Sequence, residues 1–289
     1  MGQENAMERI LLAGATGYLG RFILKELLQR DYQVKTLVRD AGKVKADGYP
    51  DLEICEAEIT DAGSIKGCCD TIDVVISTVG ITKQKDGLAY MDVDFQANVN
   101  LLEEAQRAGV RKFIYVSALN ADKLTHLAIC RAKEMFVEKL KNSGVDFCVI
   151  RPNGFFSDMA EFIAMAQRGR VYLFGRGQFR CNPVHGADLA TVCVDAVNLP
   201  DQEIEVGGPE LLTHEEIARL AFDSLEKPPR ISYIPDWLRK CVLRSLQLLT
   251  KQTFHGPVEF FLTVMAMDMI APEYGSRTLK EFFSGLSKQ

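Results

Sequence analysis

The sequence lacks the features that would place it in several specialised classes. Its eight cysteines include no Cys-x-x-Cys pair and no regular spacing, and its four histidines are scattered. This pattern favours neither a disulfide framework nor a metal cluster. No secretory leader is evident at the N-terminus. We therefore predict reduced thiols, a cytoplasmic location and no bound metal ion.

Long apolar runs and an excess of positive charge are also missing. No stretch reaches the roughly 18 apolar residues that a membrane-spanning helix needs; the nearest approach, 257–271, contains Glu259 and Asp268. The formal net charge is −5, and phosphate binding without sequence preference needs a basic face. We expect no membrane span and no nucleic-acid partner. The sequence leaves the oligomeric state open.

The first half of the chain alternates apolar runs with amphipathic stretches. The predicted strands are 9–14, 33–39, 52–58, 73–80, 112–118 and 146–152. Helical patterns lie between them at 21–30, 95–109 and 132–144, with Gly109 and Gly144 at the expected helix ends. Alternation of this kind implies parallel strands joined by right-handed crossovers. It predicts an α/β fold with a Rossmann-type, doubly wound parallel sheet.

The pattern loosens after Pro152. A short strand, a glycine-rich loop and a helix starting near Asp188 are predicted first. Thr213 and Glu216 then form a capping box that opens another helix. The chain from about 231 is mostly helical in pattern. We predict a Rossmann domain over 1–152 and a smaller, mainly helical lobe over 153–289, part of which returns to the first domain across a soft boundary.

A glycine-rich loop separates the first strand from the first helix. Residues 13–20 read AGATGYLG, with glycines at 14, 17 and 20. A helix that begins directly after a strand presents backbone N–H groups and a partial positive charge to a pyrophosphate. The spacing predicts a dinucleotide-binding loop. Its residues are Gly14, Thr16, Gly17, Tyr18, Leu19 and Gly20.

The end of the second predicted strand bears on the choice of cofactor. An acidic residue there binds the ribose hydroxyls of NAD, whereas an arginine suits the 2′-phosphate of NADP. Arg39 occupies this place, with Lys43 nearby, which favours NADP(H). The alternative is an ordinary surface arginine beside Asp40.

Together with AEITD (57–61), STVG (77–80) and VSA (116–118), the loop gives the chain a family resemblance. It resembles atypical members of the short-chain dehydrogenase/reductase superfamily, in the branch that holds NmrA-like and isoflavone-reductase-like proteins. The resemblance implies that Glu58 and Ile59 border the adenine, Glu58 standing where aspartate is usual. It also implies that Val79 and Gly80 lie along the adenosine, and that Ser117 lies near the nicotinamide.

The usual catalytic pair of this superfamily is incomplete. Its members typically carry tyrosine and lysine four residues apart on one helix face, where the lysine lowers the pKa of the tyrosine that passes a proton to a carbonyl. Lys133 fits the lysine, but Ile129 stands where the tyrosine would be. Isoleucine donates no proton, so the standard tyrosine mechanism is disfavoured.

Several stretches between 112 and 283 resemble NADPH-dependent divinyl chlorophyllide 8-vinyl reductases. They include RAKEMFVEKL, IRPNGFFSDMAEF, NPVHGADLA and VGGPELLTHEEIARLAF. The resemblance implies reduction of a conjugated carbon–carbon double bond in a small apolar or conjugated substrate. Lys133 would protonate or electrostatically stabilise what develops. Pro152, Asn153 and Phe155 are expected at the nicotinamide end.

Two other functions stay open at this point. The first is a non-catalytic NADP-binding sensor or assembly factor, as NmrA-like sensors are. The second is an epimerase or dehydratase, which is disfavoured because those enzymes generally use the missing tyrosine.

Overall fold

A seven-stranded sheet gathers strands from residues 9 to 206 of the chain. The computed structural model describes residues 8–44, 52–81, 87–250 and 252–287. The strand order is β3-β2-β1-β4-β5-β6-β9, and neighbouring strands from β3 to β6 run parallel. The strands are β1 (Arg9–Ala13), β2 (Gln33–Val38), β3 (Glu53–Glu56), β4 (Val74–Ser77), β5 (Lys112–Val116), β6 (Asp146–Pro152) and β9 (Glu203–Val206). The six predicted strands and the Rossmann-type fold are confirmed; β9 was not predicted.

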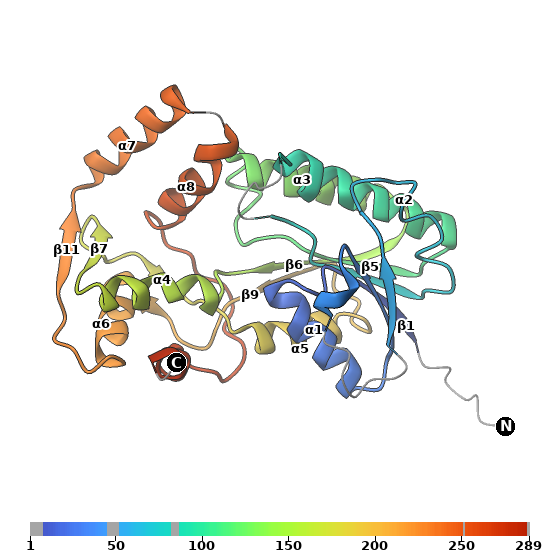
Figure 1. Cartoon of the computed structure of the whole chain (residues 1–289), viewed down its shortest axis with the longest axis horizontal. Helices are drawn as coiled ribbons and strands as arrows, with labels where there is room; N and C mark the ends of the chain where they lie inside the picture. The colour runs from blue at the N-terminus through green and yellow to red at the C-terminus, as the bar shows by residue number, and fades with distance from the viewer. Residues whose placement is uncertain (1–7, 45–51, 82–86, 251, 288–289) are drawn as a thin grey trace. The chain divides into compact units, whose positions relative to one another are not determined.

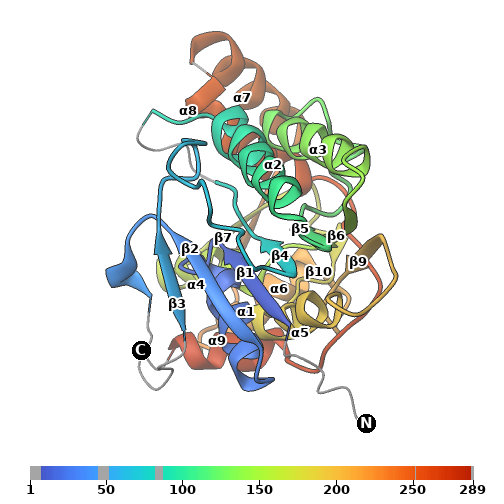
Figure 2. The same ribbon diagram turned by 90° about the vertical axis from the view of Figure 1, so that its right-hand side faces the viewer.

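Helices cover both faces of this sheet. α1 (Tyr18–Gln29) lies on one face, and α2 (Asn98–Ala108) and α3 (Ala128–Lys141) lie side by side on the other (Figure 1, Figure 2). The short 3₁₀ helix η1 (Ala41–Lys43) follows β2. Gly109 ends α2 in the left-handed conformation with φ +74°, and Gly144 has φ +78°, as expected for glycines that follow helices.

The start of the second predicted helix differs from the sequence expectation. The pattern places it at 95, but the chain is already helical from Met91, as the π-helix η2 (Met91–Ala97) that leads into α2. A π-helix shifts the register of the side chains that follow, so 3.6-residue periodicity does not reveal it. π-helical segments are frequent at functional sites.

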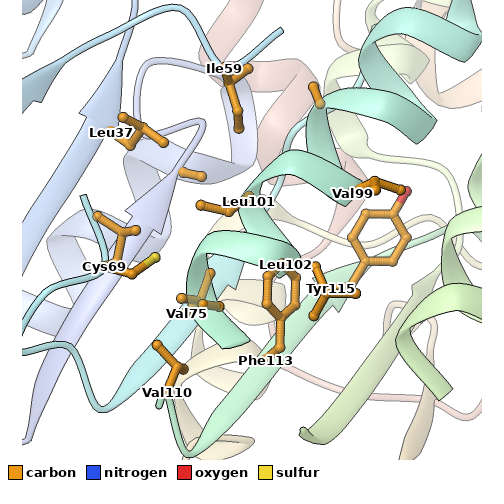
Figure 3. Packing of buried hydrophobic residues seen from close by; sticks show 14 of the residues in the cluster. Leu37, Ile59, Cys69, Val75, Val99, Leu101, Leu102, Val110, Phe113 and Tyr115 are labelled. Carbon is orange, nitrogen blue, oxygen red and sulfur yellow. The ribbon is translucent and has the colours of Figure 1, made fainter. Parts of the chain in front are cut away.

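The hydrophobic core of the sheet lies under α2 and α3. Side chains at alternating strand positions point to this face, such as Leu11 with Ala13 and Phe113 with Tyr115. Figure 3 shows part of the cluster, with Tyr115 at one end. Apolar side chains from both helices complete the cluster, so the face of the sheet that carries Tyr115 is buried from water.

The described structure divides into two compact units that interleave along the chain. The first comprises Met1–Ser117, Ile129–Ile150 and Leu189–Ile204, and the second comprises Ala118–Ala128, Arg151–Asp188 and Glu205–Gln289. Each unit therefore contains segments from both halves of the sequence. The helix α5 (Gly186–Asp195) and the strands β6 and β9 each contain a point where the chain changes unit.

The second unit combines helices with two small sheets. β7 (Val171–Phe174) pairs in parallel with β11 (Ile231–Ile234), and β8 (Arg180–Cys181) pairs antiparallel with β10 (Leu212–Thr213). Its helices are α4 (Phe156–Gln167), α6 (His214–Asp223), α7 (Asp236–Leu249), α8 (Gln252–Val264) and α9 (Leu279–Ser287). The predicted capping box is present at the start of α6. Within the described ranges, no helix is both long and apolar enough to cross a membrane.

Candidate functional site: the carboxyl edge of the parallel sheet

The glycine loop forms a tight turn between β1 and α1. Gly14 follows β1 with φ +90°, and the Gly17 amide donates a hydrogen bond of 3.0 Å to the Gly14 carbonyl. Gly17 is the N-cap of α1 and supplies no side chain to cap it. The first amides of a helix have no partner within it. The loop therefore presents the start of α1 at the carboxyl end of β1.

The fold constrains the three glycines to different degrees. A Cβ on Gly20 would lie 2.1 Å from the Gly14 carbonyl oxygen, and one on Gly14 would lie 2.5 Å from Thr78 Oγ1. Gly17 has an ordinary φ of −72°, and a Cβ there would approach only the Gly14 oxygen, at 3.3 Å. The fold thus dictates Gly14 and Gly20, whereas nothing among the described neighbours forbids a side chain at exposed Gly17.

A pyrophosphate fits this arrangement. The absent side chain of Gly17 leaves room where helix amides and the helix dipole attract an anion. Thr16 and Tyr18 are half-buried on either side of Gly17, and the Leu19 side chain is buried, so that Leu19 offers its amide alone. These residues would hold the phosphates of a dinucleotide.

Arg39 follows β2 as an exposed side chain. Asp40 accepts a hydrogen bond from the Gly42 amide and pairs with Lys43, whose ammonium lies 3.0 Å away and lowers the pKa of the Asp40 carboxyl. Within the described ranges, Arg39 forms no ion pair. Asp40 forms its ion pair with Lys43 and not with Arg39. The guanidinium of Arg39 is therefore available to a ligand phosphate.

The segment after β3 is fixed by its own hydrogen bonds. The Glu58 carboxylate accepts from the amide (3.2 Å) and the hydroxyl (2.9 Å) of Thr60. Ile59 is buried, and its carbonyl accepts a bond of 3.1 Å from the Asn100 side chain. These bonds hold Glu58 in an Asx-like turn, and its side chain is exposed.

The loop after β4 is tied to η2 by a buried asparagine. Asn98 donates to the carbonyls of Val79 (3.2 Å), Val93 and Asp94, and it accepts from the Ser77 hydroxyl at 2.6 Å. Val79 is half-buried and Gly80 is exposed. This network fixes the backbone of Val79 and Gly80 beside the glycine loop, since β4 pairs directly with β1.

Because Gly80 has no side chain, an ion pair can lie directly against the backbone of this loop. A Cβ at Gly80 would lie 2.6 Å from Asp94 Oδ1 and 3.0 Å from Lys133 Nζ. The Lys133 ammonium itself lies 3.0 Å from Asp94 Oδ1, and the other carboxylate oxygen of Asp94 accepts from the Ile81 amide at 3.2 Å. The α3 lysine and the η2 aspartate therefore meet at the carboxyl end of β4.

Tyr115 completes the surroundings of the ammonium. Lys133 Nζ lies 5.5 Å from the centroid of the Tyr115 ring, within the range of a cation–π contact. The Tyr115 side chain is fully buried against Phe136. Its hydroxyl has no well-formed hydrogen bond with any residue that the structure describes. The Lys133 side chain is 13% exposed.

The three groups shift one another's pKa values. Burial alone would lower the pKa of Lys133, but the facing Tyr115 and Asp94 outweigh it and raise that pKa above its ordinary value. Burial raises the pKa of Asp94, against the opposing charge of Lys133. Burial also raises the pKa of Tyr115, to about 12. Lys133 is therefore a cation at neutral pH and Tyr115 a neutral phenol.

Two other predicted positions are associated with α3: Ser117 contacts this helix, and Ile129 lies on it. The buried Ser117 hydroxyl donates to Glu134 Oε1 at 2.9 Å. Ile129, one turn before Lys133 on α3, is buried and purely apolar. The helix α3 therefore supplies an ammonium at Lys133 but no hydroxyl at position 129, four residues earlier.

The predicted nicotinamide-end residues after β6 belong to the second unit. Asn153 is buried, and its amide donates to Asn182 Oδ1 (2.8 Å) and the Met269 carbonyl (2.7 Å). The Pro152 carbonyl accepts from the Leu119 amide at 2.9 Å, and Phe155 is the N-cap of α4. The donor groups of Asn153 are committed inside the unit.

Sequence reasoning missed two members of the Lys133 cluster. Asp94 lies on η2, whose π-helical register no apolar periodicity reports. Tyr115 lies in an apolar strand, where a tyrosine is ordinarily a core residue. The signal was strand alternation, because Tyr115 is two residues before Ser117 and so faces the same side.

A family profile described as NAD(P)H-binding matches residues 14–200. The chain belongs to this NAD(P)H-binding family. The match includes the glycine loop, the loop after β4 and α3, so the predicted nicotinamide dinucleotide cofactor is confirmed as NAD(P)H.

Curated relatives include proteins with two different named functions. The chain is 26% identical to the chloroplastic divinyl chlorophyllide a 8-vinyl-reductase of Cucumis sativus, covering 95% of this chain and 75% of that protein. The Arabidopsis thaliana protein of the same name is 25% identical over 97% and 77% of the two chains. The photosystem II assembly factor Ycf39 of Trieres chinensis is 25% identical over 81% and 74%. The predicted resemblance to the reductases is confirmed. The cytoplasmic location stays a prediction, since the names of these reductases specify chloroplasts.

Solved structures share the fold at low identity. The Escherichia coli NADPH-dependent quinone oxidoreductase complexed with NADPH has a TM-score of 0.71 and 18% identity, over 96% of this chain and 99% of that one. The Campylobacter jejuni UDP-Glc/GlcNAc 4-epimerase has a TM-score of 0.73 and 14% identity, over 97% and 98%. Both are similar in architecture, and at this identity the likeness concerns the fold alone.

Proposed function

We propose that the protein is an NADPH-dependent reductase of the atypical short-chain type that reduces a carbon–carbon double bond conjugated to an electron-withdrawing system. When bound, NADPH would supply the hydride to one carbon, and Lys133, directly or through a water molecule, would deliver the proton to the other. The observation that carries the proposal is the buried Asp94–Lys133 pair, held against Gly80 at the carboxyl end of β4. The named reductases among the relatives support the same reaction class.

Lys133 serves the reaction as a positioned cation. Asp94 fixes Nζ at 3.0 Å, and the raised pKa keeps the proton on the nitrogen at neutral pH. A preorganised ammonium stabilises negative charge that develops on an electron-withdrawing group. Asp94 and Tyr115 act through Lys133 and are positioning residues.

The apolar residue before Lys133 favours this reaction over carbonyl reduction. Ile129 cannot donate the proton that a carbonyl oxygen requires. A conjugated alkene instead develops charge that is delocalised away from the hydride-accepting carbon, and an ammonium stabilises such charge without a phenol. The Ile129→Tyr variant is accordingly expected not to reduce carbonyls efficiently, because an added hydroxyl without supporting geometry is not a placed acid.

The test is NADPH oxidation with a panel of conjugated alkenes that includes divinyl tetrapyrroles. Lys133→Met keeps the apolar stem and removes the ammonium, and it is expected to lower kcat by about 10²- to 10⁴-fold. NADPH affinity should fall less, because the glycine loop is intact. Lys139→Met, on an exposed position of the same helix, is the matched control and should leave kcat unchanged. Unaltered turnover of Lys133→Met would remove this lysine from the mechanism.

A non-catalytic NADP-binding sensor or assembly factor is the second candidate. The similarity to Ycf39, together with the missing hydroxyl at Ile129, favours it specifically. The parent protein distinguishes the two. Tight NADPH binding without turnover across the whole panel would favour the second candidate and count against the reductase.

A further inference from the structure

Helix α7 of the second unit carries an apolar face that no described residue covers. None of its 14 residues is buried. Trp237 is 64% exposed, and Leu248 and Leu249 are 85% and 83% exposed. Large apolar side chains gathered on one exposed face are a candidate interaction surface.

The exposed apolar residues follow the helical repeat. Residues that are four and eleven positions apart lie above one another on an α-helix. One row is Trp237, Cys241 and Leu248, and the adjacent row is Leu238, Val242 and Leu249. All six are exposed, and the two rows, with the exposed Ser245 between them, form one stripe along the helix, which we call the α7 stripe.

The opposite face of α7 is already occupied. Arg239 donates to the Leu262 carbonyl of α8 at 3.2 Å, and Gln247 donates to Glu259 Oε1 at 2.6 Å. Leu243 is half-buried on this side. In both views α7 runs beside α8 (Figure 1, Figure 2). The α7 stripe therefore points away from the helix that anchors α7.

The charge on this helix is opposite to that of the whole protein. α7 carries three cationic side chains and one anionic one, in a chain whose net charge is −5. Asp236 pairs with Arg239 (2.6 Å) and Lys240 (3.1 Å). Arg244 is exposed and pairs with no acidic side chain of the described residues. By helical position, Lys240 and Arg244 border the α7 stripe on the side of Trp237.

We propose that the α7 stripe is a docking surface for an anionic lipid bilayer, on which α7 lies in the interfacial plane. Helices of this kind place Trp and Leu at the boundary of the acyl chains and bring Lys or Arg to the headgroups. Basic side chains near an anionic surface add about 1 kcal/mol each, which is about fivefold in partitioning. This inference concerns where the protein acts and does not depend on the proposed reaction.

A second copy of the chain is a poorer occupant. A helix of 14 residues is about 21 Å long at 1.5 Å per residue. With a width of ~10 Å, the stripe offers on the order of 200 Å², whereas stable interfaces bury about 800 Å² per partner. Two copies would also oppose their basic borders. A bilayer needs neither a matching shape nor a matching area.

The protein contains one tryptophan, and it lies on the proposed surface. Intrinsic fluorescence of the full chain therefore reports docking directly. We expect a blue shift of Trp237 emission and co-sedimentation with vesicles of phosphatidylcholine and phosphatidylglycerol. Binding to pure phosphatidylcholine should be at least about fivefold weaker, since the basic residues then lack a partner.

Two variants and one control make the test specific. Leu248→Asp combined with Leu249→Asp should weaken vesicle binding at least about tenfold, because charges replace the most exposed apolar groups. Arg244→Glu should weaken binding to anionic vesicles alone. Leu199→Asp, at an exposed position in the first unit, should bind as the parent does. Far-UV circular dichroism verifies that each variant is folded.

Three results would overturn the inference. The first is the absence of binding by the parent to anionic vesicles. The second is binding that the Leu248 and Leu249 changes leave intact. The third is a lipid-free dimer of the parent that these changes convert to a monomer in sedimentation velocity, because it would assign the stripe to a second copy.

Discussion

Two buried asparagines, one in each unit, form similar hydrogen-bond networks over very different lengths of chain. Asn98 joins the loop after β4 to η2, and the hydrogen bonds of its side chain reach residues no more than 21 positions away. Asn182 bonds to Asn153 and Gly208, 29 and 26 residues away, and to both backbone polar groups of Ala271, 89 residues away. Both side chains are fully buried.

This difference explains why the fold of the first unit can be predicted from sequence more completely than that of the second. In the first unit, consecutive strand–helix segments build the cofactor edge, so a short motif carries most of its geometry. In the second unit, Asn182 gathers segments that no motif connects. A function that depends on the first unit is therefore visible in a local pattern, whereas the architecture of the second depends on contacts between distant residues.

The largest expected effect tests the long-range network. Asn182→Leu leaves the Ala271 amide and carbonyl and the Gly208 carbonyl without partners, and it should lower the free energy of unfolding by about 3–5 kcal/mol. Urea unfolding followed by far-UV circular dichroism measures the loss. Asn142→Leu, at an exposed position, should change stability by less than about 1 kcal/mol. Equal losses for the two variants would contradict the importance of the network.

A change at Gly17 tests the local motif. Gly17→Val should weaken NADPH binding by about 3 kcal/mol, because the side chain displaces phosphates from charge-assisted hydrogen bonds that contribute ~1.5–3 kcal/mol each. The backbone conformation at Gly17 is ordinary, so the fold should persist. Isothermal titration of the folded variant measures the loss. Gly285→Val, where the new side chain meets open space, is the control. Unchanged affinity of Gly17→Val would refute the loop assignment.

A buried histidine should make stability depend on pH in the second unit. Burial lowers the pKa of His214 to about 4, from an ordinary 6.5. Between these values the unfolded chain binds a proton that the folded chain does not. The contribution is therefore complete above pH 6.5 and is lost as the pH falls toward 4. The linkage relation gives a loss of about 2–3 kcal/mol.

His214→Gln should flatten this slope. Urea unfolding at pH 7, 5.5 and 4.5 measures it, with His126→Gln at an exposed position as the control. A slope that persists in His214→Gln would assign the acid sensitivity to other groups.

The smallest expected effect concerns cofactor choice at the edge of the first unit. If Arg39 binds the 2′-phosphate, Arg39→Ala should weaken NADPH by about 2 kcal/mol, the scale of a charged hydrogen bond, and leave NADH nearly unchanged. Titration with both cofactors checks the difference. Equal losses, or none, would show that Arg39 does not discriminate between them.

Several features of the chain, most of them in the first unit, could be predicted without the structure. Six strands followed from apolar runs with helical patterns between them. Gly109 and the Thr213–Glu216 box followed from helix-end chemistry. The family resemblance identified Lys133 and the missing tyrosine. These signals are readable because each depends on residues within a few positions of one another.

Tertiary structure decided what surrounds these residues. It brought Asp94 and Tyr115 to Lys133, placed β9 in the sheet and committed Asn153 to Asn182. It also left the α7 stripe exposed, which composition cannot distinguish from a core helix. The sequence by itself determined the parallel sheet and its glycine loop, because hydrophobic period and glycine spacing are local quantities. The charge and burial of Lys133 were decided by the fold, because they depend on side chains from separate elements that meet only in three dimensions.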